Sequence, residues 1–144
     1  TGRPRADSLR LRLAFGVNPQ QDGRLYTLPM LPMLPMLPNS ERAIVEPSKV
    51  RDYLLSPAHP VGRFKAAVFA ALGYTHEQWE TLQADLLAMG RTNSAVAGQV
   101  SFYGQKYEVS GILMGPSGRS GRFVSVWLVP TGDDVPRLVT VFPG

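Results

Sequence analysis

The sequence has 144 residues, of which 44% are hydrophobic, and a formal net charge of +4. This length and hydrophobic content predict a single domain that buries a core without covalent cross-links. The chain contains no cysteine, which excludes disulfides, thiolate metal sites and cysteine nucleophiles.

The sequence indicates neither a metal site nor a membrane-spanning segment. The two histidines, His59 and His76, do not stand in a zinc-binding motif, so we expect no metal and no cofactor. No apolar run approaches the ~20 residues of a membrane span, and the first residues lack the apolar segment of a signal peptide. We therefore expect a soluble fragment with no membrane span, whose export signal lies elsewhere.

The positive charge is concentrated at the start of the chain. Residues 1–24 hold five arginines against two acidic residues, whereas the rest is nearly balanced. A basic chain favours a polyanionic partner, but in the remainder of this chain only a local cationic cluster can attract one.

Residues 1–38 are expected to form a leader and a linker, and residues 39–144 the domain. Leu9, Leu11 and Leu13 alternate with arginines, a pattern that fits a short strand or a tail. A Leu-Pro-Met triplet then recurs from Leu28 to Met36. Proline at every third position favours a polyproline II spacer, although its leucine stripe also fits a groove of the domain.

Three helices are predicted next, over residues 47–55, 61–72 and from about 75 to Gly90. Phe64, Val68 and Leu72 share one face of the second helix, and Gly73 is expected to end it. A capping box formed by Thr75 and Gln78 is expected to begin the third helix. Its core residues recur at helical spacing: Trp79, Leu82, Leu86 and Met89.

The pattern then changes to a period of two. Strands are predicted over residues 107–113, 123–129 and 138–142, with turns at 115–121 and around Asp133 and Asp134. Helices followed by strands indicate an α+β fold, in which N-terminal helices pack on a C-terminal antiparallel sheet.

The segment 57–65 is the best candidate for chemistry. It brings His59, Arg63 and Lys65 together at the start of the second predicted helix. An imidazole that titrates near pH ~6.5 and free helix amide groups suit a phosphate ligand. A surface turn with solvated charges explains the same residues.

Two further places are candidates. Tyr103, Lys106 and Tyr107 surround Gly104 at the start of the first predicted strand, where they fit either phosphate and base binding or an ordinary strand start. Thr140 alternates with Leu138 and Phe142 on one expected strand face. Its hydroxyl must find a hydrogen bond or point into a cleft.

Residues 37–143 resemble a bacterial domain family found at the ends of polymorphic toxins and phage head proteins. The resemblance is carried by Leu37-Pro38-Asn39, Asp52-Tyr53-Leu54-Leu55, His59-Pro60, Lys65, residues 103–107 and residues 137–143. That family is similar to the barnase, EndoU, colicin and RelE group of small ribonucleases, which is abbreviated BECR. Thr140-Val141-Phe142-Pro143 matches the end of their last strand, with valine where alanine is more usual.

The resemblance implies metal-independent endoribonuclease activity that leaves a 2′,3′-cyclic phosphate. In that reaction His59 would be the base or the acid, and Lys65 with Arg63 or Lys106 would stabilise charge on phosphorus. Thr140 would orient a phosphate oxygen. Substrate contacts would come from Tyr103, Tyr107 and Arg137. The implied partners are RNA and a cognate immunity protein, and the toxin would be exported as part of a larger chain to act in the target-cell cytoplasm.

Two other functions fit the same composition. One is a non-catalytic α+β adaptor that docks a larger protein through its leader and proline repeat. The other is ADP-ribose transfer from NAD, for which the sequence shows no convincing arginine, serine and glutamate arrangement.

Overall fold

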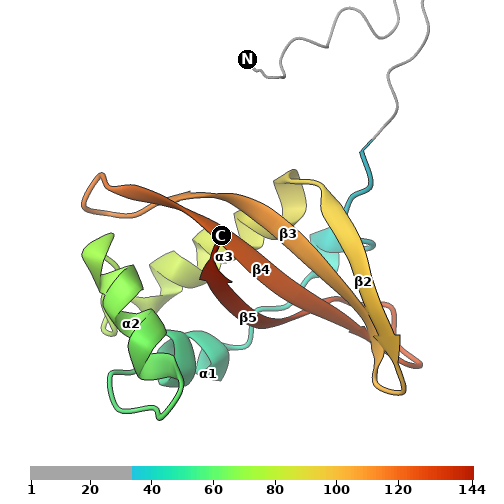
Figure 1. Ribbon diagram of the computed structural model, residues 1–144, viewed down its shortest axis with the longest axis horizontal. Coiled ribbons are helices and arrows are strands. Elements are labelled where there is room, and N and C mark those ends of the chain that lie inside the picture. Colours follow the sequence, from blue (N-terminus) through green and yellow to red (C-terminus); the bar gives the residue numbers. More distant parts are fainter. Residues whose placement is uncertain (1–33) are drawn as a thin grey trace, which may run out of the picture. The chain divides into compact units, whose positions relative to one another are not determined.

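The structure is a computed structural model that describes residues 34–144, and Pro35–Gly144 forms one compact unit (Figure 1). The predicted strand over residues 9–13 and the repeat up to residue 33 lie outside the described residues. The helical elements are η2 (Ser40–Arg42), α1 (Pro47–Lys49), η3 (Val50–Leu54), α2 (Gly62–Ala71) and α3 (Trp79–Thr92). The strands are β2 (Ala95–Ser101), β3 (Gly104–Met114), β4 (Ser120–Pro130) and β5 (Arg137–Pro143).

The compact unit includes the last residues of the predicted linker. Ala95 N–H donates a hydrogen bond of 2.7 Å to the carbonyl of Pro35, and Met36 forms an antiparallel bridge with Ser94. Leu37 is buried among the core residues. Residues 35–37 therefore pack as part of the fold.

The four strands form one antiparallel sheet in the order β2-β3-β4-β5. The α+β prediction and the three predicted strands are confirmed. Strand β2 was missed, because every residue after Ala95 in it is exposed and the pairing with β3 is irregular between Ala97 and Val100. An exposed edge strand with a bulge lacks the alternation that identifies a half-buried strand.

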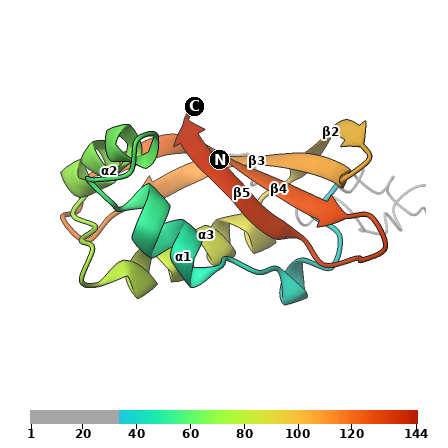
Figure 2. The ribbon, with the colours of Figure 1, turned by 90° about the horizontal axis from the view of Figure 1, so that it is seen from below.

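The helices cover the two faces of the sheet unequally. Helices α1 and α3 lie on one side, here called the inner face, while α2 lies beside the end of β5 (Figure 2). Val109, Phe123 and Trp127 point into the core on the inner face. The opposite side, here called the outer face, carries Lys106, Val124 and Val126, which alternate with these residues. Among residues 34–144, no helix packs over the outer face (Figure 2).

Helix α3 supplies most of the predicted helical core. Leu82, Leu86 and Met89 are buried and Trp79 is half-buried. Gly90 does not end the helix, as the sequence had indicated, because α3 continues to Thr92. A Cβ on Gly90 would stand 2.6 Å from Cζ2 of Trp127, so glycine is needed for the close approach of helix and sheet.

The ring of Trp127 is fixed by hydrogen bonds as well as by packing. Its Nε1–H donates to Ser125 Oγ at 2.9 Å, and that hydroxyl donates to the carbonyl of Val109 at 2.9 Å. Both side chains are fully buried, and this chain of bonds satisfies their polar groups. Trp127 therefore has little freedom to move away from α3.

The predicted face of α2 is only partly correct. Leu72 is buried, but Phe64 is 66% exposed and Val68 is 37% exposed, whereas Ala66 and Phe69 are buried. Because α2 lies beside the sheet, only one narrow side of it meets the core. Gly73 follows the helix with a φ of 97°, as the predicted stop requires.

Both predicted turns are confirmed. Gly115 N–H donates to the carbonyl of Arg119 at 2.9 Å and closes the connection between β3 and β4. Asp133 Oδ1 accepts the backbone N–H groups of Asp134 and Val135, so its carboxylate holds the turn before β5.

A bulge in β5 decides which way its residues face. Leu138 pairs with Trp127 and Thr140 pairs with Val126, so Val139 is an extra residue between them. Leu138 stays on the inner face, whereas Thr140 and Phe142 face outward. The expectation that Leu138, Thr140 and Phe142 share one face is therefore wrong for Leu138.

The contact between Gly90 and Trp127 can be tested by adding one methyl group. Gly90→Ala should lower the free energy of unfolding by about 1–3 kcal/mol, because the added Cβ overlaps a ring that cannot move. In a helix without this constraint the same change stabilises by up to ~1 kcal/mol. Chemical denaturation measures the difference. In a Trp127→Phe background the loss should shrink, and an unchanged loss would contradict the proposed contact.

Candidate active site

The segment from η3 to the start of α2 meets the outer side of β5. Helix α1 continues directly into η3, which is π-helical, and Leu55 N–H donates to the carbonyl of Val50 at 2.9 Å. Such widened turns are frequent at functional sites. Here the turn carries Tyr53, whose hydroxyl lies 3.0 Å from Thr140 Oγ1. Either oxygen can be the donor in this hydrogen bond.

His59 lies three residues before α2 and caps the backbone that leads into the helix. Its Nδ1 accepts the N–H groups of Val61 at 3.0 Å and Gly62 at 2.9 Å, and its carbonyl accepts the N–H of Arg63. These are the hydrogen bonds of an N-cap residue, with Pro60 at the first helical position, where proline is favoured. The regular helix is assigned from Gly62, and boundaries of this kind commonly differ by one or two residues.

The cap determines which nitrogen of the neutral His59 ring carries the hydrogen. Because Nδ1 accepts two hydrogen bonds, the neutral imidazole carries its proton on Nε2. His59 is therefore arranged to donate a hydrogen bond through Nε2–H.

A close backbone contact brings this cap to Tyr53. The ring centroids of Tyr53 and His59 are 5.0 Å apart with an interplanar angle of 74°, an edge-to-face arrangement. A Cβ on Gly62 would stand only 1.9 Å from the carbonyl oxygen of Tyr53. Glycine at position 62 is therefore what allows α2 to start directly against η3.

Two lysines lie over aromatic rings near this hydrogen bond. Lys49 Nζ lies 5.3 Å from the ring centroid of Tyr53, and Lys65 Nζ lies 6.0 Å from that of Phe142. Arg63 instead stacks on its neighbour Phe64 at 4.6 Å. A pocket of about 550 Å³ adjoins the site and is lined by Ser48, Lys49, Asp52, Tyr53, His59 and Val61.

Asp52 is the carboxylate of this pocket. It accepts hydrogen bonds from Arg51 Nε at 3.1 Å and Nη2 at 3.2 Å. The hydrogen bond from Arg51 lowers the pKa of Asp52 below its ordinary value, and the charges of Arg51 and His76 act in the same direction. Because it stays ionised and paired, Asp52 is poorly suited to accept a proton near neutral pH.

Two of the predicted residues, His59 and Thr140, contact Tyr53, and a third, Lys65, lies over the ring of Phe142 at the end of β5. Tyr103 does not join them. It is 73% exposed in the turn between β2 and β3, and this turn and α2 lie at opposite ends of the sheet (Figure 1).

The other predicted substrate residues are also dispersed. Lys106 is exposed on the outer face of β3, opposite Leu128. Arg137 of β5 pairs with the same β4 residue, Leu128. Its Nη1 forms an ion pair of 2.8 Å with Glu46. Tyr107 packs against the core on the inner face, opposite to the side that Thr140 faces.

Tyr53 and Lys49 are the residues that sequence reasoning missed. They stand four positions apart, so they share one side of a helix, and this spacing could have indicated a site. Tyr53 also belongs to the stretch that carries the family resemblance, although it was given no role. Its pairing with Thr140 spans 87 residues, which no local pattern reveals.

Comparisons with known proteins support this part of the chain as a unit. Residues 36–144 match the model of a family described as a domain of unknown function, DUF6883. The chain belongs to this family. No curated protein matches it significantly.

One solved structure similar to the DUF6883 domain is the contact-dependent growth inhibition toxin–immunity protein complex from Klebsiella pneumoniae 342. The TM-score is 0.55 at 18% sequence identity, and the match covers 72% of this chain and 95% of that one. At this identity the likeness shows a shared fold. Within residues 34–144, no helix is long and apolar enough to cross a membrane, and no three potential metal ligands cluster.

The capping role of His59 can be separated from any chemical role. His59→Ala should lower the free energy of unfolding by about 1 kcal/mol, because two backbone donors lose their acceptor. His59→Asn should retain most of the stability, since asparagine is a good N-cap residue. Thermal and chemical denaturation of both variants measure this, and equal stability of the Ala and Asn variants would contradict the cap.

Proposed function

We propose that this DUF6883 domain is a metal-independent endoribonuclease of the toxin type. The observation that carries the proposal is the hydrogen bond between Tyr53 and Thr140 beside His59, with Lys49 and Lys65 nearby. Two hydrogen-bonded hydroxyl groups, an imidazole N–H donor and two cations suit cleavage at a phosphodiester.

In the proposed reaction the ribose 2′-oxygen bonds to phosphorus while the bond from phosphorus to the 5′-oxygen breaks. The 2′ proton passes to Thr140 Oγ1, Thr140 passes its own proton to Tyr53, and Tyr53 gives its proton to the leaving 5′-oxygen. Each hydroxyl gains and loses one proton, so both end as they began. The products are a 2′,3′-cyclic phosphate and a 5′-hydroxyl.

The other residues act on the charge of the phosphate. His59 donates Nε2–H to a non-bridging oxygen, where charge builds up in the transition state. Lys49 and Lys65 attract the phosphate and stabilise the same charge. His59 was expected to be the base or the acid. Its cap at Nδ1 favours this donor role instead, because Nε2–H is the group of the ring that stays free.

The outer face of the sheet offers the approach for RNA. It lies on the side that Thr140 and Phe142 face, and no described helix covers it (Figure 2). Lys106 lies farther along this face, where it can contact a phosphate away from the cleavage point. Tyr103 lies at the far end of the sheet, so it would contact only an RNA that extends several nucleotides from the cleavage point.

Cleavage of total RNA in EDTA tests the proposal. Tyr53→Phe and Thr140→Val should each lower the cleavage rate by ~10²- to 10⁴-fold, because each breaks the proton relay. His59→Asn should lower it by ~10²-fold or more through loss of the Nε2–H donor, with stability retained. Lys65→Ala should also reduce the rate.

A matched control is Thr81→Val, which makes the same change on the exposed side of α3 and should leave the rate unaltered. End-group analysis should find 2′,3′-cyclic phosphate. RNA that stays intact with micromolar wild-type protein would overturn the nuclease proposal and favour the adaptor. Full activity of Tyr53→Phe would overturn the relay.

The toxin role is proposed from the fold likeness to a growth inhibition toxin that was solved with its immunity protein. In this proposal the domain is delivered as part of a larger exported chain, acts in the cytoplasm of the target cell, and is inhibited by a cognate protein.

Expression in the bacterial cytoplasm tests the toxin role. The wild-type chain should arrest growth, and total RNA from these cells should carry new 2′,3′-cyclic phosphate ends. Tyr53→Phe at equal protein level should not arrest growth. Normal growth with soluble, active wild-type protein would contradict the toxin role without affecting the nuclease assay.

A further inference from the structure

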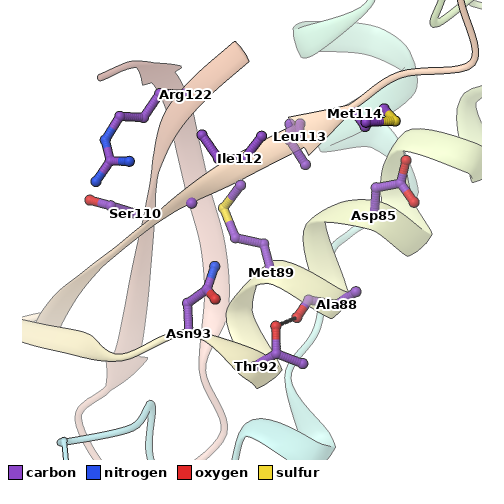
Figure 3. A pocket seen from close by; sticks show the side chains of 11 residues that line it. Asp85, Ala88, Met89, Thr92, Asn93, Ser110, Ile112, Leu113, Met114 and Arg122 are labelled. Carbon is purple, nitrogen blue, oxygen red and sulfur yellow. Dashed lines mark hydrogen bonds between the residues drawn. The ribbon is translucent and has the colours of Figure 1, made fainter. Parts of the chain in front are cut away.

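A groove lies between α3 and the last part of β3, away from the pocket that is lined by residues 48–61. It has a volume of about 500 Å³, and Figure 3 shows Met89 and Asn93 extending from α3 toward β3. Ile112 and Met114 belong to its β3 side and are 57% and 65% exposed. The groove thus runs along the edge of a strand and is lined by both apolar and polar side chains.

The backbone of β3 is open along this groove. Gly115 N–H donates toward β4 and the carbonyl of Val109 accepts from Ser125 of β4, so odd-numbered residues of β3 direct their backbone groups to β4. Ile112 and Met114 therefore direct their N–H and C=O groups away from β4. No strand among residues 34–144 pairs with them, because β2 starts opposite Val109.

The reason for this gap lies at the start of β2. Ser94 pairs with Met36, and Ala95 donates its N–H to the carbonyl of Pro35. The chain before Ala95 is therefore drawn away from β3 toward residues 35–36. Helix α3 continues below the position that an extension of β2 would occupy. The space between α3 and the last residues of β3 therefore holds no strand of residues 34–144.

An extended polypeptide is the ligand that this geometry fits. Four backbone groups at alternating positions match the donors and acceptors of one added strand. The side chains of that strand would alternate between the floor at Met89 and the outer side beside Ile112 and Met114. A small polar ligand would leave Met89, Ile112 and Met114 uncovered and most of the backbone groups unpaired.

The charges around the groove favour an acidic strand. Arg122 stands opposite Ile112, and Arg119 lies in the following turn, and both are exposed. Asp85 on the floor already accepts a hydrogen bond of 2.6 Å from the hydroxyl of Tyr74. A second copy of this chain would bring the same two arginines to the junction, whereas an acidic partner would neutralise them.

We propose that the open edge of β3 at Ile112 and Met114 binds an extended, acidic strand of a partner protein, which adds to the sheet over α3. The added strand pairs with the outward backbone groups of Ile112 and Met114, places an apolar side chain against Met89, and directs carboxylates toward Arg119 and Arg122. This surface is independent of the proposed nuclease reaction.

The experiment titrates the full chain, labelled with ¹⁵N, with a seven-residue peptide in which valine alternates with glutamate. Amide signals of Ile112 and Met114 should shift, and their hydrogen exchange should slow at least 10-fold at saturation. A peptide of the same sequence with N-methyl groups on the pairing side, and one with lysine in place of glutamate, should bind at least 10-fold more weakly.

Variants locate the site. Ile112→Pro removes one outward donor without cutting the β3–β4 pairing, and proline is tolerated at such edge positions. Ile112→Glu keeps the backbone and repels the acidic peptide. Both should weaken binding at least 10-fold. The matched control Val100→Glu, at an exposed position of β2, should bind the peptide like the wild type.

Three results would overturn the proposal. One is an absence of shifts at Ile112 and Met114 with millimolar peptide. The second is slow exchange of these amides in the dilute chain alone, which would mean that another segment of the same chain fills the edge. The third is protection that rises with protein concentration, which would mean that a second copy does.

Discussion

The bulge in β5 is the constraint on which the candidate site depends. One extra residue, Val139, lets Leu138 and Val141 both reach the core while Thr140 turns to the outer face. In a regular strand Thr140 would share a face with Leu138 and lie in the apolar core, where its hydroxyl would need a buried partner. The bulge instead directs it to Tyr53. Bulges next to active sites commonly redirect a side chain in this way.

The parts of the fold that could be predicted are those with a local cause. Helical spacing identified Leu82, Leu86 and Met89, and alternation identified three strands, because the buried residues of each element recur on one face. Strand β2 has no buried face beyond Ala95, and α2 buries a narrow side, so neither gives a clear period. Gly90 looked like a helix stop because its actual reason, the ring of Trp127, is distant in sequence.

The site was predictable to a similar degree. His59, Lys65 and Thr140 were named from chemistry and resemblance. In the structure His59 and Thr140 contact Tyr53, and Lys65 lies over the ring of Phe142. The role of His59 depends on which nitrogen is free, and this follows from two backbone hydrogen bonds that composition cannot reveal. Tyr107 and Arg137 were placed with the substrate, but pairing in the sheet turns one to the core and sets the other beside Glu46.

The contact between Gly62 and Tyr53 has a consequence for the kind of RNA that the proposed nuclease site would accept. Tyr53 meets α2 through its backbone carbonyl and β5 through its hydroxyl, so one residue holds the two walls of the site at a fixed separation. Neither wall can move outward without losing one of these contacts. A site with fixed walls leaves the adjustment of shape to its ligand. Unpaired loops and ends of RNA can bend their backbone to meet it, whereas a regular duplex cannot.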